Sequence, residues 1–326
     1  MNRSLFFRLN ESIAVAGLLL ATMTLLGSAP AAAQGEGPRV YLLSPVDINA
    51  LSLTWMDLSS NFNFSQSILI EDADVRSDIW ALNYNRFFSV GGRMAEIWVT
   101  GIWGSVEGDI QVGPEPPPIV PFPPGSTVRV PKESGIADPY LAMRVGLIGA
   151  PALKVEEFMQ HRPGFQLYAL AGANVPVGDY DASRPVNLGT NRWALRLGLP
   201  MVVPFGSPAS RAALEIVPSF YYFTDNDDPF RADLREQDPL YVLETHLTRN
   251  FTPKFWAGLD LRYQFGGKTT TDGISDRNTI DQLGGGVVAG YQLTRALQVW
   301  ASYGEILAQN DNSIGEMFRV RMILAF

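Results

Sequence analysis

The sequence predicts an all-β fold, a transmembrane antiparallel β-barrel of about twelve strands. Three observations predict it: apolar residues that alternate with polar or small ones, connections that are alternately short and long, and a last strand that ends on an aromatic residue. The first two candidate strands, Val46–Trp55 and Val75–Phe88, alternate poorly. A count of about ten strands therefore remains an alternative, since bacterial barrels of this kind have even strand numbers.

The alternation is clearest from Phe255 to Phe265. One face of this stretch carries Phe, Ala, Leu, Leu, Tyr and Phe, and the other carries Trp, Gly, Asp, Arg and Gln. A helix would mix the two sets, whereas a strand separates them, because side chains along a strand have a period of two. The same period recurs over 192–199 and 214–220. Pro218 interrupts the second of these, and we expect a bulge or the shoulder of a strand there.

The connections between these stretches fall into two classes. Short ones, expected to be periplasmic turns, are Ser89–Gly92, Gly206–Ser210, Asn250–Pro253 and Leu293–Arg295. Long polar ones, expected to be outer loops, are Asn61–Asp74, Asp109–Gly135, Asp179–Thr190, Asp225–Asp238 and Gly267–Asp276. This alternation is typical of outer-membrane barrels. One connection, Ala150–Pro163, is longer than its position requires, and we expect a short helix over Val155–Gln160.

The C-terminus supports the same fold. The last strand places Phe318, Val320, Met322, Leu324 and Phe326 on one face and two arginines on the other. A soluble β-sandwich, the alternative fold, explains neither this ending nor the alternating connections. A final aromatic residue is the kind of signal that the barrel-assembly machinery reads, so we expect that machinery to recognise Phe326. The other expected partner is outer-membrane lipid.

The N-terminus has the features of a secretory signal peptide. Arg3 and Arg8 precede an uncharged apolar run, Ile13–Leu26, and Ala31–Ala33 forms a small-residue cleavage site before Gln34. We therefore expect residues 1–33 to be removed and residues 34–326 to form a single outer-membrane barrel domain. The chain has no cysteine, which excludes a lipid-modified cysteine anchor and thiolate chemistry.

Composition narrows the function further. The chain has 25 Lys and Arg against 33 Asp and Glu, a formal net charge of -8. Nucleic acid is not an expected partner, because phosphate binding requires a basic surface. Neither a cofactor nor a metal ion is expected, since the acidic stretches 225–228 and 272–276 do not have the spacing of an EF-hand loop.

The alternation also predicts which side chains line the lumen: Arg144, Arg192, Arg196, Glu215, Glu244, His246, Asp260, Arg262, Arg319, Arg321, Trp256 and Trp300. The charged members admit two interpretations. They could form a constriction that orients a polar solute, or they could pair with one another and stabilise a narrow barrel. The aromatic members could line a path for aromatic molecules or fill space in the lumen.

Two further features leave alternatives open. Ser219 and His246, with Glu215 or Glu244, could in principle form the nucleophile, base and orienting group of a lipid hydrolase. We expect no enzymatic activity, because such a site would have to meet lipid at the outer wall. The Pro-rich segment 114–131 is expected to be an exposed rigid loop. Because it contains the apolar residues Ile119, Val120 and Phe122, the alternative is that it folds into the barrel mouth as a gate.

From about Gly135 onward the chain resembles an outer-membrane family associated with the meta-pathway of phenol degradation. The residues that carry the resemblance are Ala137–Tyr140, Pro176–Asp181 and Gly189–Trp193, with Val177 where the family usually has Thr. The resemblance implies a barrel that passes hydrophobic or aromatic compounds across the outer membrane. The expected function is accordingly a passive channel or transporter for small solutes, and the alternative is a structural or adhesive barrel.

Overall fold

The computed structural model describes residues 36–59, 73–111, 127–184, 186–207, 210–276, 278–309 and 315–326. By their contacts, residues Ala31–Phe326 group into one compact unit. Three of the sequence expectations lie outside the described residues. They are the signal peptide at 1–33, most of the loop Asn61–Asp74, and residues 114–126 of the Pro-rich segment 114–131.

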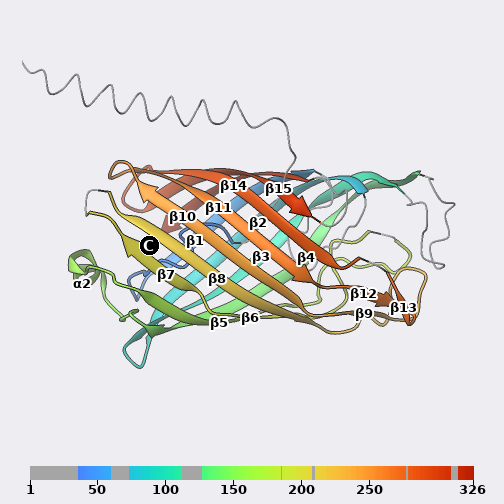
Figure 1. The fold of residues 1–326 in the computed structure, drawn as a ribbon, viewed down its shortest axis with the longest axis horizontal. Helices are drawn as coiled ribbons and strands as arrows, with labels where there is room; N and C mark the ends of the chain where they lie inside the picture. The colour runs from blue at the N-terminus through green and yellow to red at the C-terminus, as the bar shows by residue number, and fades with distance from the viewer. Residues whose placement is uncertain are drawn as a thin grey trace, which may run out of the picture. The chain divides into compact units, whose positions relative to one another are not determined.

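The described residues form a closed antiparallel β-barrel whose wall has 12 strands (Figure 1). In chain order the wall elements are β1 (Asn49–Ser59), β2 (Ala73–Val90), β3 (Arg93–Gln111), β4 (Thr127–Ile148), β5 (Gln166–Asn174), β6 (Ala194–Gly198), β7 (Met201–Phe205), β8 (Ala212–Phe223), β10 (Leu240–Asn250), β11 (Phe255–Gly266), β14 (Ile280–Gln292), β15 (Leu297–Gln309) and β16 (Glu316–Ala325). Consecutive strands pair along the chain, and β1 pairs with β16 to close the wall. The fold expected from the sequence is confirmed, with the larger of the two strand counts.

The elements β6 and β7 together form one strand of the wall, because both pair with β5 on one side and with β8 on the other. The break between them, at Leu199 and Pro200, lies beside Pro218 of β8. The amide of Leu199 donates to the carbonyl of Pro218 at 3.1 Å. Because Pro218 has no N–H, it cannot donate the reciprocal hydrogen bond to Leu199, and the pairing between the two strands is interrupted there. Pro218 is therefore within a strand rather than at a shoulder, and the irregularity falls on the neighbouring strand.

Short and long connections alternate as expected, which defines a short-turn end and a long-loop end of the barrel. The turn between β2 and β3 uses Gly91 and Gly92, both with positive φ. The expected helix is α2 (Val155–Gln160), in the β4–β5 connection at the short-turn end. At the long-loop end β9 (Arg235–Gln237), β12 (Thr269–Thr271) and β13 (Ile274–Ser275) form a separate small sheet (Figure 1).

The loop between β3 and β4 is shorter than the predicted range Asp109–Gly135. The two strands remain paired far beyond the length that spans a membrane. They contain 19 and 22 residues, against the roughly 9–11 that cross a bilayer. The register shifts between Thr100 and Ile102 and between Val106 and Gly108. Residues 138–139 and 131–132 of β4 fall at these two irregularities, so the prolines at 131 and 139 do not stop the strand.

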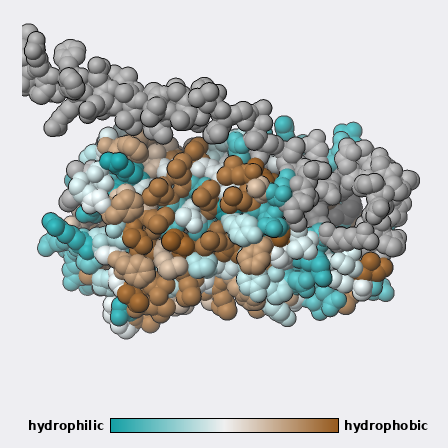
Figure 2. All heavy atoms as spheres, in the orientation of Figure 1, coloured by the Kyte–Doolittle hydropathy of each residue, from teal (hydrophilic) through white to brown (hydrophobic). Residues whose placement is uncertain are grey.

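The wall has two faces of opposite character. Leu259 of β11 is 56% exposed, whereas its neighbour Asp260 is 1% exposed. Many large apolar side chains are exposed in the same way, and Figure 2 shows them gathered over the middle of the strands on one face of the molecule. Such an apolar band is what lipid would cover. Within the described residues, no helix is both long and apolar enough to cross a membrane.

Candidate functional site

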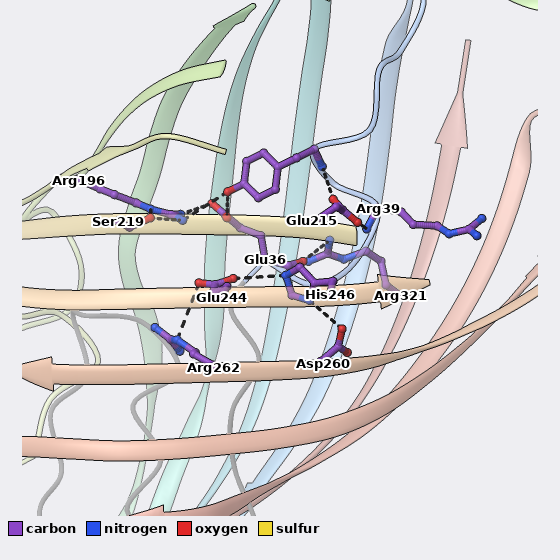
Figure 3. A network of polar contacts seen from close by, with 11 residues as sticks. Glu36, Arg39, Arg196, Glu215, Ser219, Glu244, His246, Asp260, Arg262 and Arg321 are labelled. Carbon is purple, nitrogen blue, oxygen red and sulfur yellow. Dashed lines mark hydrogen bonds and ion pairs between the residues drawn. The ribbon is translucent and has the colours of Figure 1, made fainter. Parts of the chain in front are cut away.

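The segment before β1, residues 36–48 (the N-terminal segment), lies inside the barrel. Its Tyr41 is fully buried, and Leu43 and Val46 join a buried cluster with Phe87 and Trp98 of the wall. Glu36 pairs with Arg196 of β6 at 2.6 Å, and its carbonyl accepts from Arg321 of β16 at 3.1 Å (Figure 3). This segment has no periodic pattern in the sequence that would indicate its position inside the barrel.

Close approach of backbone to side chains fixes the start of the N-terminal segment. Gly37 has φ +92°, and a Cβ there would lie 2.8 Å from a guanidinium nitrogen of Arg319 and 3.3 Å from the ring of Trp300. The backbone conformation favours glycine, and a side chain at this position would also displace the end of Arg319. The hydroxyl of Tyr41 donates to the carboxylate of Glu36. Burial raises the pKa of Tyr41 well above its ordinary value, so the hydroxyl stays protonated.

Arg39 is the second charged residue that the N-terminal segment brings into the lumen. Its guanidinium donates to Asn250 at 2.5 Å and Thr248 at 3.3 Å, and stands 4.3 Å over the ring of Trp256. Its backbone amide donates to Glu215 at 2.7 Å. Burial lowers the pKa of Arg39 to about 10, which leaves the side chain charged at neutral pH.

Glu215 is fully buried on β8 and holds the N-terminal segment through its backbone. Besides the amide of Arg39, it accepts the amide of Tyr41 at 3.1 Å, so both carboxylate oxygens are used. A carboxylate that accepts two backbone amides makes charge-assisted hydrogen bonds, which are stronger than neutral ones. The segment is therefore attached to the wall by its backbone as well as by its side chains.

A second polar network lies on β10 and β11 (Figure 3). The register places Glu244 opposite Arg262 and His246 opposite Asp260. The Nδ1 of His246 lies 2.7 Å from Asp260, its Nε2 lies 3.7 Å from Glu244, and Arg262 approaches Glu244 at 3.8 Å. Of the two interpretations left open for the charged residues, these contacts are the mutual pairs of the second one.

The remaining predicted residues are spread along the barrel. Arg144 of β4 is fully buried, pairs with Glu96 of β3 at 2.5 Å and stacks over Tyr168 at 4.7 Å. The guanidinium carbons of Arg319 and Arg321 lie 4.8 and 5.0 Å from the centre of the Trp300 ring. Arg321 also donates to Thr54 of β1 at 2.8 Å.

Arg192 lies nearer the long-loop end than the other predicted residues. It donates to Gln237 and stands 5.0 Å over the ring of Phe223. Burial, followed by the nearby charge of Arg235, lowers the pKa of Arg192 to about 10. This arginine therefore belongs to the packing of the outer loops on the barrel.

The connection between β5 and β6 also enters the barrel, at the long-loop end. Val186 and Leu188 are buried against Ile79, Ile102 and Met317 of the wall, among others. Asp138 of β4, which is fully buried, accepts from the amides of Gly178 at 2.8 Å and Thr190 at 2.9 Å, and from the Thr190 hydroxyl at 2.6 Å. Asp138 was recognised in the sequence only as part of a motif, without a role.

Between the N-terminal segment and the wall lies a cavity of about 340 Å³, which we call the chamber. Five arginines line it (Arg39, Arg196, Arg262, Arg319 and Arg321), against three glutamates (Glu36, Glu96 and Glu244). Its lining thus has an excess of positive charge in a chain whose formal net charge is -8. The other side of the chamber, on β1 to β3, carries neutral polar and apolar side chains except for Glu96.

A second cavity of about 200 Å³ lies towards the short-turn end. It is lined by Leu42 and Leu43 of the N-terminal segment, by Phe158 of α2 and by residues of β7 and β8. Arg39 lines both cavities. This residue therefore stands between the chamber and the short-turn end of the barrel.

The contacts do not form a hydrolase triad. The Oγ of Ser219 accepts from Arg196, at 3.0 Å from Nη2 and 3.1 Å from Nε. Ser219 lies opposite Val242 and His246 opposite Glu215. Serine and histidine are therefore four positions apart along the strands, about 13 Å, far beyond hydrogen-bond reach. Among the described residues, no group of three or more His, Asp or Glu side chains could hold a metal ion.

Comparisons with known proteins point to one family. The family model described as "Putative MetA-pathway of phenol degradation" matches residues 49–321. The fold is similar to that of an outer membrane channel from Pseudomonas putida F1, with a TM-score of 0.70 and 19% identity over 89% of this chain and 99% of that one. The transport unit of the autotransporter AIDA-I from Escherichia coli gives a TM-score of 0.48 and 8% identity over 88% and 94%. No curated protein shows significant similarity to the sequence.

Proposed function

The chain belongs to the family named for the MetA-pathway of phenol degradation, and from this premise we propose that it is a passive channel of the bacterial outer membrane. Small solutes would pass through the barrel lumen. The observation that carries the proposal is the chamber, a cavity of about 340 Å³ enclosed by a closed barrel and lined by charged and aromatic side chains. An interior that served only to stabilise the barrel would be filled by such side chains rather than hollowed.

The proposed path has two constrictions among the described residues. From the long-loop end a solute meets the β5–β6 connection with Val186 and Leu188. Beyond the chamber it meets Arg39, which also lines the second cavity. Both constrictions are made by segments that are not strands of the wall, so either can move without opening the barrel.

The localisation is part of the proposal. The exposed apolar band supports insertion in a lipid bilayer, and the predicted signal peptide supports export. Cleavage after Ala33 would put the new amino terminus at Gln34, two positions before Glu36 in the chain. N-terminal sequencing of protein recovered from outer membranes should begin at Gln34, and an intact Met1 in inserted protein would contradict the proposed processing.

The channel function is tested by planar-bilayer recordings of the refolded protein. We expect discrete current steps in potassium chloride and a reversal potential that favours chloride, because the lining of the chamber carries an excess of arginine. A matched sample unfolded by heating serves as the control. Protein that is folded, as judged by its heat-modifiable migration on gels, and yet gives no current would overturn the proposal in favour of a structural barrel.

A further inference from the structure

Exposed basic side chains are present at every connection of the short-turn end. The five connections there, taken with two flanking strand residues on each side, join β2 to β3, β4 to β5, β7 to β8, β10 to β11 and β14 to β15. They contain two acidic residues, Glu156 and Glu157 of α2. Their basic residues are all exposed and together form what we call the basic rim: Arg93, Lys154, Arg162, Arg211, Arg249, Lys254 and Arg295.

The long-loop end has the opposite balance of charge. Its connections between β5 and β6, between β8 and β10 and between β11 and β14 contain ten acidic residues against six basic ones. The formal net charge of -8 is therefore not spread evenly along the barrel. An anionic partner would be attracted to the short-turn end and repelled from the long-loop end.

The protein itself does not neutralise the basic rim. None of its side chains forms an ion pair with another residue in the part of the chain that the structure describes. The carboxylate of Glu157 accepts the backbone amide of Lys154 at 2.9 Å instead of pairing with a rim side chain. The rim charges are therefore available to an anion from outside the chain.

Exposed aromatic side chains adjoin the basic rim. Phe251 and Phe255 are 47% and 37% exposed, their ring centres lie 6.0 Å apart, and Tyr291 is paired with Phe255 across β11 and β14. The guanidinium carbon of Arg249 lies 5.7 Å from the centre of the Phe251 ring, and Lys254 directly precedes Phe255. Aromatic girdles mark the two membrane interfaces of outer-membrane barrels. The rim therefore lies at the level where lipid headgroups would begin.

We propose that the basic rim binds the headgroups of anionic phospholipids in the inner leaflet of the outer membrane. Basic side chains at a membrane surface attract lipids that carry a net negative charge. A soluble acidic partner would use the rim charges alone, whereas a phospholipid would use the aromatic side chains as well, with its headgroup at Arg249 and its acyl chains at Phe251 and Phe255. The inference goes beyond the channel: it rests on the proposed insertion in a bilayer and not on the passage of solutes.

Native mass spectrometry of the refolded protein in detergent tests the preference. Phosphatidylglycerol and phosphatidylcholine with identical acyl chains are added in equal amounts. Phosphatidylglycerol should be retained at least about fivefold more, the factor expected for one basic side chain at an anionic surface. The preference should shrink between about 0.1 M and about 1 M ammonium acetate, because the Debye length falls from about 10 Å to about 3 Å. Equal retention of the two lipids would overturn the proposal.

A soluble polyanion tests the competing partner. Polyglutamate is added to the same protein in place of lipid. If it binds while the two phospholipids are retained equally, the rim serves an acidic soluble partner and the proposal fails. Retention of phosphatidylglycerol in the presence of excess polyglutamate is the result expected, because the polymer offers no acyl chain to the aromatic side chains beside the rim.

Two triple variants test the assigned residues. The rim variant combines Arg249→Gln, Lys254→Gln and Arg295→Gln, and should lower the preference for phosphatidylglycerol at least about twofold, because it removes three of the rim charges. The control variant removes the same charge from exposed residues at the long-loop ends of β2 and β4, through Arg76→Gln, Arg129→Gln and Lys132→Gln. It should keep the wild-type preference. Only variants with heat-modifiable migration are compared, and an equal effect of the two variants would overturn the proposal.

Current recordings separate this inference from the channel proposal. None of the three residues changed in the rim variant lines the chamber, so this variant should keep the current steps of the wild type. Current steps without a lipid preference would leave the channel and remove the lipid site. A preference for phosphatidylglycerol without current steps would leave the lipid site and remove the channel.

Discussion

Arg196 and Glu36 form a buried ion pair of 2.6 Å, although 160 residues separate them in the sequence. Arg196 belongs to the wall and Glu36 to the N-terminal segment, so the pair connects the segment to the barrel. Arg196 also contacts Ser219 and the hydroxyl of Tyr41. The pair is therefore the centre of the contacts that keep the segment inside the lumen.

Glu36→Gln should loosen the N-terminal segment and raise single-channel conductance. The change removes the charged partner of a buried arginine, which we expect to cost the segment about 1–3 kcal/mol of local stability. Faster hydrogen exchange of residues 36–48 should accompany the rise. Asp47→Asn is the control, because the exposed pair of Asp47 with Arg86, at 3.8 Å, is worth little. Unchanged exchange in Glu36→Gln would show that the backbone contacts of Glu215 hold the segment alone.

Two changes at Phe326 separate its backbone from its side chain. The amide of Phe326 donates to the Asn49 carbonyl at 2.9 Å, and its carbonyl accepts the Asn49 amide at 2.8 Å, which closes the seam between β16 and β1. Deletion of Phe326 removes both hydrogen bonds, whereas Phe326→Ala removes only the ring. If the assembly machinery reads the ring, both variants should accumulate less folded barrel in outer membranes. Normal assembly of Phe326→Ala would assign the role to the seam instead.

A charge placed on the apolar band should be costly. Leu259 is 56% exposed near the middle of β11. Leu259→Arg should therefore lower the free energy of unfolding in lipid vesicles by about 2–4 kcal/mol, the cost of arginine near the centre of a bilayer. Leu259→Met keeps the volume and the apolar character, and should change stability by less than about 1 kcal/mol. Equal effects of the two variants would show that this face does not contact lipid.

The wall of the barrel is predictable because its pattern is local. Alternation along β11 separates Leu259 from Asp260, and neighbouring hairpin strands then bring Glu244 opposite Arg262. These relationships need only a period of two and a short turn. The bounds of β3 and β4 are less predictable, since their paired ends contain the Gly, Asp and Pro residues that usually mark loops. Pairing with a neighbour outweighed this local preference.

The contents of the lumen are not predictable in the same way. Glu36 follows the predicted signal peptide and precedes the first strand, so it is indistinguishable from a linker in the sequence. Its partners Arg196 and Arg321 lie 160 and 285 residues away. No periodic pattern encodes such contacts, because they depend on closure of the whole barrel. The arginines could be placed on the inner face, but the residues that neutralise them could not be assigned.

The arginines of β16 should set the ion preference of the proposed channel. Replacing Arg319 and Arg321 together with Gln leaves three arginines and three glutamates in the lining of the chamber. The preference for chloride should then disappear from the reversal potential measured across a salt gradient. In the wild type the preference should weaken in about 1 M salt, where the Debye length falls to about 3 Å. A reversal potential that is unchanged in the double variant would place the selectivity outside the chamber.

Asp138 holds the β5–β6 connection, the constriction at the long-loop end of the proposed path. Asp138→Asn should loosen the β5–β6 connection, because the amide nitrogen would replace one carboxylate oxygen and face either the Gly178 amide or the two donors of Thr190. We expect a local loss of about 1.5–3 kcal/mol, the usual value for hydrogen bonds to a charged group. Hydrogen exchange over residues 175–193 should rise, and Val186 and Leu188 should become accessible to solvent.

The control for this change is Thr190→Ser, which keeps the hydroxyl that donates to Asp138. It should leave both hydrogen exchange and conductance close to the wild type. If the β5–β6 connection constricts the path, Asp138→Asn should also raise conductance, whereas the N-terminal segment should keep its slow exchange. Faster exchange without any change in current would mean that this connection packs in the barrel but does not limit the passage of ions, and the narrowest point would then lie at Arg39.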